Sequence, residues 1–126
     1  MNYYLKVTTE FGRGLYATNT IKKNKVIMQC EVLAFSEFDT VLINQTDLKF
    51  YTFKYEGKKD CLVLGDGEIF NHSDTANVGY VLQLVDDRKV MVFYALNDIK
   101  PEEQLFINYN ADTEVNTDLY KDKNLF

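Results

Sequence analysis

The 126-residue sequence contains only two cysteines, one histidine and one proline, and it lacks tryptophan. Cys30 and Cys61 are too few for a disulfide framework or a four-cysteine zinc site, so we expect two buried, reduced thiols. A lone histidine with no cysteine pair beside it does not supply the ligands of a usual zinc site. Asp66, Glu68 and Asp74 do not have the spacing of a calcium-binding loop. The sequence therefore predicts no metal site.

Long apolar runs are also missing. No segment approaches the roughly 20 apolar residues that span a bilayer. The N-terminal segment MNYYLKVTTEFGRG lacks the apolar core of a signal peptide. We therefore expect a protein without a signal peptide or membrane segment, located in the cytoplasm or in the nucleus of a host cell.

Basic residues are in the minority, with 14 Lys and Arg against 19 Asp and Glu, which gives a formal net charge of -5. A protein that binds nucleic acid through its phosphates needs a concentrated surplus of Lys and Arg, so we expect no direct nucleic-acid binding. A basic protein partner suits this charge better, although net charge describes attraction and not sequence choice.

Short apolar segments rich in Val, Ile, Tyr and Phe predict a mainly β chain. Residues 80–85 and 90–96 flank the polar turn Asp86-Asp87-Arg88 and predict a hairpin, whose nearly continuous apolar strands suggest that both faces are covered. One helix is predicted to begin at the N-cap residue Ser36 and to continue through Ile43. No repeat or Pro/Ser-rich linker divides residues 1–126, which predicts a single domain. Further strands are predicted over residues 3–7, 14–17, 26–28, 31–35, 61–64 and 105–107.

The first segment with chemical potential is Gly12-Arg13-Gly14, which follows a predicted strand. It is either a tight turn or a place where the missing Cβ lets a ligand approach the backbone closely. The third glycine and following helix of a dinucleotide-binding fingerprint are absent, so we exclude that interpretation.

Two further segments contain the only histidine and a terminal tyrosine. LGDGEIFNHSDTANVGY, residues 64–80, places His72 among asparagines and aspartates. Because no Ser-His-Asp or Cys-His order accompanies it, the residue types alone favour a packed, hydrogen-bonded histidine. IKPEEQLFINYN, residues 99–110, carries a strand that leads to Tyr109, whose hydroxyl is either satisfied in the core or functional.

Taken together and in this order, the three segments resemble the SET-domain family of protein-lysine methyltransferases. EFGRGLYATNTIKKNKVI is similar to the opening segment of that family, and IKPEEQLFINY to its closing segment. In the central segment, Asn-His-Ser is followed four residues later by Asn77. The resemblance spans roughly residues 3–110, and compact viral and bacterial members have the most similar plan. It implies a β-clip-like fold of several short β-sheets with small helices around a threaded C-terminal segment.

The resemblance also implies an activity: methyl transfer from S-adenosylmethionine to the side-chain amine of a lysine in a protein substrate. In the family, the cofactor binds on one face and the lysine enters a narrow channel from the other. A lysine ammonium must lose its proton before its nitrogen can act as a nucleophile. Burial and the nearby sulfonium cation both lower the lysine pKa, so no strong base is required.

Site residues follow from the matched motifs. The cofactor would be bound through backbone groups of the glycine pair, through the amide of Asn71 and mainly through the backbone of His72. Tyr109 is the expected catalytic tyrosine, because its hydroxyl would orient the amine and contribute electrostatic stabilisation. The expected cofactor-binding residues are Gly12, Arg13, Gly14, Asn71, His72 and Tyr109.

The channel is less closely defined by the resemblance. Tyr51, in FYTF, corresponds best to the second catalytic and channel tyrosine, and Tyr55 competes with it because this region varies in length. Phe106 and Tyr120 complete the expected channel lining.

Several positions depart from the family pattern. Asn108 stands where many members have Asp, and Thr113 falls near a position that is aromatic in compact viral relatives, which predicts a wider channel. No cysteine cluster follows the domain, so residues 111–126, with Tyr120, Leu125 and Phe126, would close the channel. A frayed terminus or a partner subunit are the alternatives, and a homodimer paired through Gly79 and Tyr80 or through the tail stays open.

Two other functions compete with catalysis. The chain could be a non-catalytic SET-like module that binds a basic peptide or partner protein, or an interaction domain whose glycine pairs are only turns. For the enzyme, the expected partner is a protein with an accessible lysine, such as a histone tail or a ribosomal protein.

Overall fold

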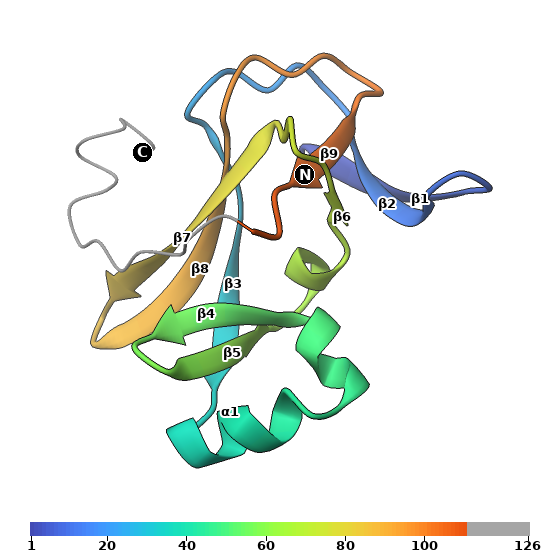
Figure 1. The fold of residues 1–126 in the computed structure, drawn as a ribbon. Helices are drawn as coiled ribbons and strands as arrows, with labels where there is room; N and C mark the ends of the chain where they lie inside the picture. The colour runs from blue at the N-terminus through green and yellow to red at the C-terminus, as the bar shows by residue number, and fades with distance from the viewer. Residues whose placement is uncertain (111–126) are drawn as a thin grey trace.

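A computed structural model of the protein describes residues 1–110, and two β-sheets dominate it (Figure 1). The helices are short: α1 spans Glu37–Ile43, and the 3-10 helices η1 and η2 span Asp47–Phe50 and Asp66–Glu68. The strands are β1 (Tyr3–Thr8), β2 (Gly12–Ala17), β3 (Val26–Ala34), β4 (Thr52–Glu56), β5 (Lys59–Val63), β6 (Asn71–His72), β7 (Val78–Val85), β8 (Arg88–Ala95) and β9 (Gln104–Ile107). The predicted mainly β fold is confirmed.

The five-stranded sheet has the order β4-β5-β3-β8-β7, and all its neighbouring strands are antiparallel. The hairpin of β7 and β8 is confirmed, with Val85 paired to Arg88 across a two-residue turn. Asp86 and Asp87 have φ angles of 48° and 67°, as a tight hairpin turn that matches the strand twist requires. Both faces of the hairpin are largely buried, as predicted.

The four-stranded sheet has the order β1-β2-β9-β6 and brings together the two ends of the described chain. β1 and β2 form an antiparallel hairpin, and β9 is antiparallel to β2. The two-residue strand β6 is parallel to β9, with Asn71 opposite Phe106 and His72 opposite Ile107. This pairing places the last described segment beside the Asn-His motif (Figure 1).

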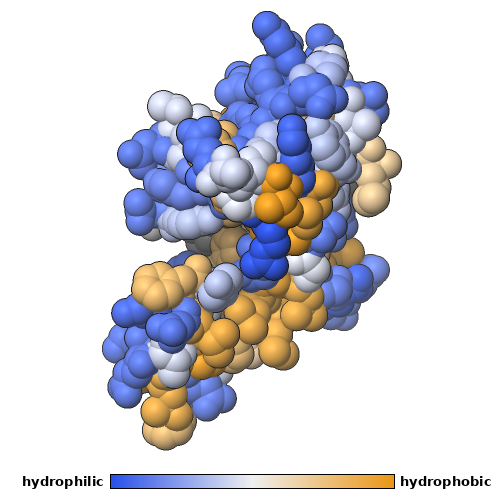
Figure 2. All heavy atoms as spheres, turned by 90° about the vertical axis from the view of Figure 1, so that its right-hand side faces the viewer, coloured by the Kyte–Doolittle hydropathy of each residue, from blue (hydrophilic) through white to orange (hydrophobic). Residues whose placement is uncertain are grey.

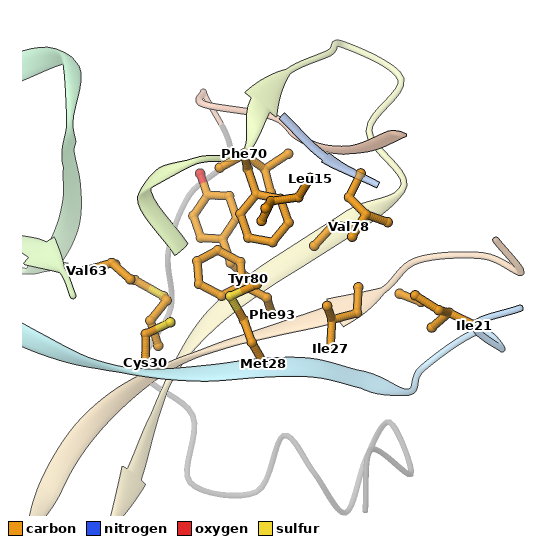
Figure 3. Packing of buried hydrophobic residues seen from close by; sticks show 14 of the residues in the cluster. Leu15, Ile21, Ile27, Met28, Cys30, Val63, Phe70, Val78, Tyr80 and Phe93 are labelled. Carbon is orange, nitrogen blue, oxygen red and sulfur yellow. The ribbon is translucent and has the colours of Figure 1, made fainter. Parts of the chain in front are cut away.

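The hydrophobic core lies between the two sheets and takes side chains from both (Figure 3). Phe93 of β8 is fully buried, and its ring lies 4.7 Å from that of Phe70. Both cysteines are buried and free, as predicted. Burial raises the pKa of the Cys61 thiol to about 12, so this group stays protonated and unreactive at neutral pH.

The predicted helix is confirmed as α1. The Ser36 hydroxyl caps it by accepting a hydrogen bond from the Asp39 amide at 3.0 Å. Thr40 is the only residue of α1 that is buried, and its hydroxyl accepts a hydrogen bond from the Asp60 amide of β5 at 3.0 Å. The helix is therefore attached to the five-stranded sheet mainly by polar contacts.

The predicted strands differ from the structure at several places. Residues 26–28 and 31–35 belong to one strand, β3, because the intervening Gln29 and Cys30 continue the pairing with β8. β4 was not predicted, since its alternating Lys54 and Glu56 interrupt the apolar pattern on its exposed side. The Gly-Arg-Gly segment is not simply a turn, because β2 begins at Gly12. Of the two glycines in this segment, only Gly12 has a positive φ angle, of 66°.

No helix in the described residues is long and apolar enough to cross a membrane.

Candidate active site

The strand that leads to Tyr109 is held by the side chain of Asn77. The Asn77 amide nitrogen donates to the Gln104 carbonyl at 2.9 Å, and its amide oxygen accepts from the Phe106 amide at 2.8 Å. One side chain therefore satisfies two backbone groups of β9. This accounts for the asparagine that follows the Asn-His-Ser motif.

Two more hydrogen bonds hold the residues that lead to Tyr109. The Tyr80 hydroxyl donates to the Asn108 carbonyl at 2.9 Å, and the Ser73 amide donates to the Ile107 carbonyl at 3.0 Å. Because Tyr80 also belongs to the hydrophobic core, the residue preceding Tyr109 is fixed directly to that core.

Tyr109 is oriented at both its backbone and its hydroxyl. Its amide donates to His72 Nδ1 at 3.0 Å, and its hydroxyl donates to the Phe70 carbonyl at 2.7 Å. Burial, followed by the negative charge of Glu68, raises the pKa of the Tyr109 phenol. The hydroxyl is therefore protonated at neutral pH, and its oxygen retains lone pairs for a further partner.

The lone histidine is a positioning group. Since the Tyr109 amide can only donate, His72 Nδ1 must accept, and the ring proton lies on Nε2. That Nε2 donates to Asp74 at 3.0 Å. The His72 ring also packs against the Tyr109 ring, with centroids 5.0 Å apart. The structure agrees with the packed, hydrogen-bonded histidine that the residue types favoured.

The Gly-Arg-Gly segment is tied to the same strands by Asn71. Its amide nitrogen donates to the Arg13 carbonyl at 2.8 Å and to Gln104 Oε1 at 2.9 Å. A Cβ on Gly14 would lie only 2.6 Å from Gln104 Oε1 and 3.0 Å from Asn71 Nδ2. A side chain at position 14 would therefore displace the Gln104 and Asn71 side chains and disturb the hydrogen bonds that they make.

Two cavities flank this framework. The first has a volume of about 570 Å³ and is walled by aromatic rings that include Tyr51, Tyr80 and Tyr109. The second has a volume of about 470 Å³ and is lined by Arg13, Leu48, Tyr51, Leu62, Val63, Leu64, Gly65 and Glu68. The face shown in Figure 2 is hollowed between an upper and a lower part, and apolar residues gather beside the hollow.

Tyr51 and Glu68 line both cavities and so form their shared wall. Glu68 Oε1 accepts a hydrogen bond from the Val63 amide at 2.9 Å. Burial raises the pKa of the Glu68 carboxyl to about 7, although the Val63 amide acts in the opposite direction. In the sequence, Glu68 stands out only as a possible metal ligand. Its place beside Tyr51 becomes apparent only in the folded chain.

The predicted site residues divide into two groups. Tyr51, Tyr109 and Arg13 line the cavities. Asn71 and His72 line neither cavity and instead bond to the Arg13 carbonyl and the Tyr109 amide.

Neither Tyr55 nor Phe106 lines either of these two cavities, and their expected place in the channel stays a prediction. Tyr55 packs against the core with the Lys89 ammonium 4.8 Å from its ring centroid, and Phe106 packs against Phe11. Tyr120, like Thr113, Leu125 and Phe126, lies outside the described residues.

Comparison with known proteins identifies the framework. The SET domain family matches residues 12–110. A histone-lysine N-methyltransferase of Schizosaccharomyces pombe, specific for H3 lysine-37, is 34% identical over 107 residues, which are 83% of this chain and 71% of the relative. The chain therefore belongs to the SET-domain family. It is a protein-lysine methyltransferase, of a family that uses S-adenosylmethionine as methyl donor.

Solved structures agree with this fold. A candidate histone methyltransferase of Plasmodium falciparum has a TM-score of 0.69 and 28% identity, with coverage of 86% of this chain and 93% of that one. A SET protein of Cryptosporidium has a TM-score of 0.72 and 18% identity, with coverage of 89% and 59%. Chaetomium thermophilum polycomb repressive complex 2 bound to S-adenosylmethionine has a TM-score of 0.68 and 22% identity, with coverage of 83% and 14%.

Proposed function

We propose that this methyltransferase binds S-adenosylmethionine at the second cavity and receives the substrate lysine in the first. The observation that supports this assignment is the wall that the two cavities share at Tyr51 and Glu68. A methyl group can pass between two bound molecules only where their sites meet, and Tyr109 lines the first cavity beside this wall.

The residues of the second cavity fit the cofactor. Gly65 lines this cavity with a φ angle of 87°, and no atom lies within 4 Å of where a Cβ would stand on it. The backbone is therefore open to a ligand at Gly65. The Arg13 guanidinium suits a carboxylate, and Leu48 and Leu64 offer apolar surface for a flat ring. When bound, the cofactor supplies a methyl group activated by a sulfonium.

The tyrosines of the first cavity would then orient the amine. The Tyr109 hydroxyl donates a hydrogen bond to the Phe70 carbonyl, so its oxygen can accept a hydrogen bond from the lysine nitrogen. The Phe70 carbonyl has a second lone pair and can accept as well. Because these groups are fixed before the substrate arrives, they reduce the cost of aligning the nitrogen with the methyl group.

A histone tail is the substrate that we favour, since the Schizosaccharomyces pombe relative carries the specificity H3 lysine-37 in its name. The net charge of -5 also suits a lysine-rich partner. A ribosomal protein is the alternative. Assembly with other subunits, including the predicted homodimer through Gly79 and Tyr80, stays a prediction.

Methyl transfer from labelled S-adenosylmethionine to histone H3 and to ribosomal proteins tests the assignment. We expect Tyr109→Phe to lower the rate about 100- to 1,000-fold, as expected for loss of one aligned polar group in an active site. Tyr55→Phe is the matched control and should leave the rate unchanged, because Tyr55 lines neither cavity. Equal activity of Tyr109→Phe and the wild type would contradict the assignment.

The cofactor site can be tested separately from turnover. Arg13→Ala should weaken binding of S-adenosylmethionine in calorimetry, whereas Arg88→Ala, at the distant hairpin turn, should not. Binding of the cofactor that is unchanged by Arg13→Ala would place the cofactor elsewhere.

A further inference from the structure

We propose that Glu68 accepts the proton that the substrate ammonium must lose before methyl transfer. The sequence offered no obvious base, and the position of this carboxyl becomes apparent only in the folded chain. The inference rests on the proposed function of the two cavities, and it adds a further catalytic residue to that site.

The placement of Glu68 is the first argument. It is the last residue of η2, and its side chain lies in the wall that separates the proposed lysine site from the proposed cofactor site. Tyr51 shares this wall, and Tyr109 lies near enough for the negative charge of Glu68 to raise the pKa of its phenol. A lysine nitrogen held by Tyr109 would therefore share the first cavity with this carboxyl.

Only one of the two carboxyl oxygens of Glu68 has a hydrogen-bond partner in the described residues. Its Oε1 accepts a hydrogen bond from the Val63 amide at 2.9 Å, and this bond fixes the side chain in place. Within residues 1–110, its other oxygen has no hydrogen bond and the carboxylate has no ion pair. This second oxygen is not among the buried polar atoms without a partner in the described residues, so it is open to the cavity and available to accept a proton from a bound ammonium.

The surroundings explain why this group can exchange a proton near neutral pH. η2 packs against β3 and β5, whose cysteines face it and remain neutral. Partial burial, without an ion pair in the described part of the chain, favours the protonated form and raises the carboxyl pKa to about 7. The titratable and charged groups around it are Arg13, Cys30, Lys49, Tyr51, Lys54, Asp60, Cys61, Asp66 and Tyr109.

The proton transfer balances within the site. One N–H bond of the lysine ammonium breaks, its electron pair stays on nitrogen, and the proton forms an O–H bond with the ionised Glu68 carboxylate. The neutral amine is the nucleophile that the methyltransferase reaction consumes. Glu68 then releases its proton to water through the cavity opening and returns to the carboxylate. No oxidant or reductant takes part.

A purely structural role of Glu68 predicts different behaviour from the same geometry. If Glu68 only caps the Val63 amide, Glu68→Gln should be silent, because the glutamine oxygen can accept the same hydrogen bond. If Glu68 is the acceptor, this substitution removes the proton site and keeps the volume and the cap. Glu37→Gln, on exposed α1, is the matched control.

The decisive experiment is the pH dependence of kcat for a histone H3 peptide at saturating S-adenosylmethionine. For the wild type and Glu37→Gln we expect kcat to rise with pH and to inflect no higher than about pH 7, because the nearby sulfonium lowers the carboxyl pKa. For Glu68→Gln we expect that inflection to disappear and kcat to fall about 100-fold or more, with a smaller change in KM. Glu68→Asp should retain the inflection with a lower rate.

A second measurement does not depend on turnover. Carbon NMR of the glutamate carboxyl signals, assigned by the signal missing in Glu68→Gln, should show one group of the free protein that titrates with a midpoint near 7. A midpoint near 4 for Glu68, or wild-type kcat and pH profile in a folded Glu68→Gln protein, would overturn the inference alone. Failure of the wild type to bind both cofactor and peptide in calorimetry would instead overturn the proposed function.

Discussion

The two sheets of this protein are stabilised in different ways. In the five-stranded sheet, β7 and β8 are largely buried and carry mainly apolar side chains. In the four-stranded sheet, β1 is largely exposed, and side-chain amides and a histidine hold β9 and its neighbours through hydrogen bonds to the backbone. Apolar burial stabilises without direction, whereas hydrogen bonds fix angles and distances. The first sheet therefore supplies stability, and the second positions Tyr109.

The largest effect should come from the core of the five-stranded sheet. Phe93→Ala removes a fully buried ring and should lower the free energy of unfolding by about 3–5 kcal/mol. Phe38→Ala, on the exposed face of α1 with 73% of the residue accessible, should change it by less than about 0.5 kcal/mol. Urea unfolding of both variants measures this difference, and similar losses in the two would contradict the core assignment.

A smaller loss of stability but a distinct loss of activity should follow from Asn77→Ala. This variant removes two hydrogen bonds to β9, at 2.9 and 2.8 Å, and should cost about 2 kcal/mol. Methyltransferase activity should fall further than the folded fraction explains, because β9 carries Tyr109 to its partners. If activity and the folded fraction fall in parallel, the Asn77 hydrogen bonds stabilise the fold but do not position Tyr109.

The pH dependence of stability probes the wall between the cavities. The Glu68 pKa is raised from 4.5 in the unfolded chain to about 7 in the fold, so the folded protein binds the extra proton. Its contribution to stability is complete below about pH 4.5 and is lost as pH rises through about 7. Glu68→Gln should therefore flatten this part of the stability curve and be more stable than the wild type at pH 8, as thermal unfolding can show. Equal stability at pH 8 would contradict the shift.

The smallest predicted effect is a gain, at the turn of the buried hairpin. Asp87 has a φ of 67°, which glycine adopts without strain. Asp87→Gly should raise the free energy of unfolding by about 0.5–1 kcal/mol and leave activity unchanged. A loss of stability in the same urea measurement would show that the Asp87 side chain contributes a contact.

The same contrast explains what could be predicted from the sequence. The β7 and β8 hairpin follows from local pattern, since its strands are continuous in apolar residues and its turn is polar. β6 could not be predicted, because two residues carry no pattern and their partner, β9, lies more than 30 positions away. The motif order identified the family and singled out Tyr109, and the resemblance favoured Tyr51 over Tyr55, but Glu68 has no local feature that marks it as lining two cavities. Tyr55 competed with Tyr51 on sequence alone, and in the fold it packs against the core and lines neither cavity.

The Tyr80 hydroxyl, bonded to the carbonyl just before Tyr109, has a consequence for how the enzyme responds to heat. The Tyr80 ring is packed in the hydrophobic core. The Tyr109 hydroxyl should therefore keep its position as long as the core stays folded. On warming, activity should then be lost at the same temperature as the cooperative unfolding of the domain. We expect no temperature range in which the enzyme is folded but inactive.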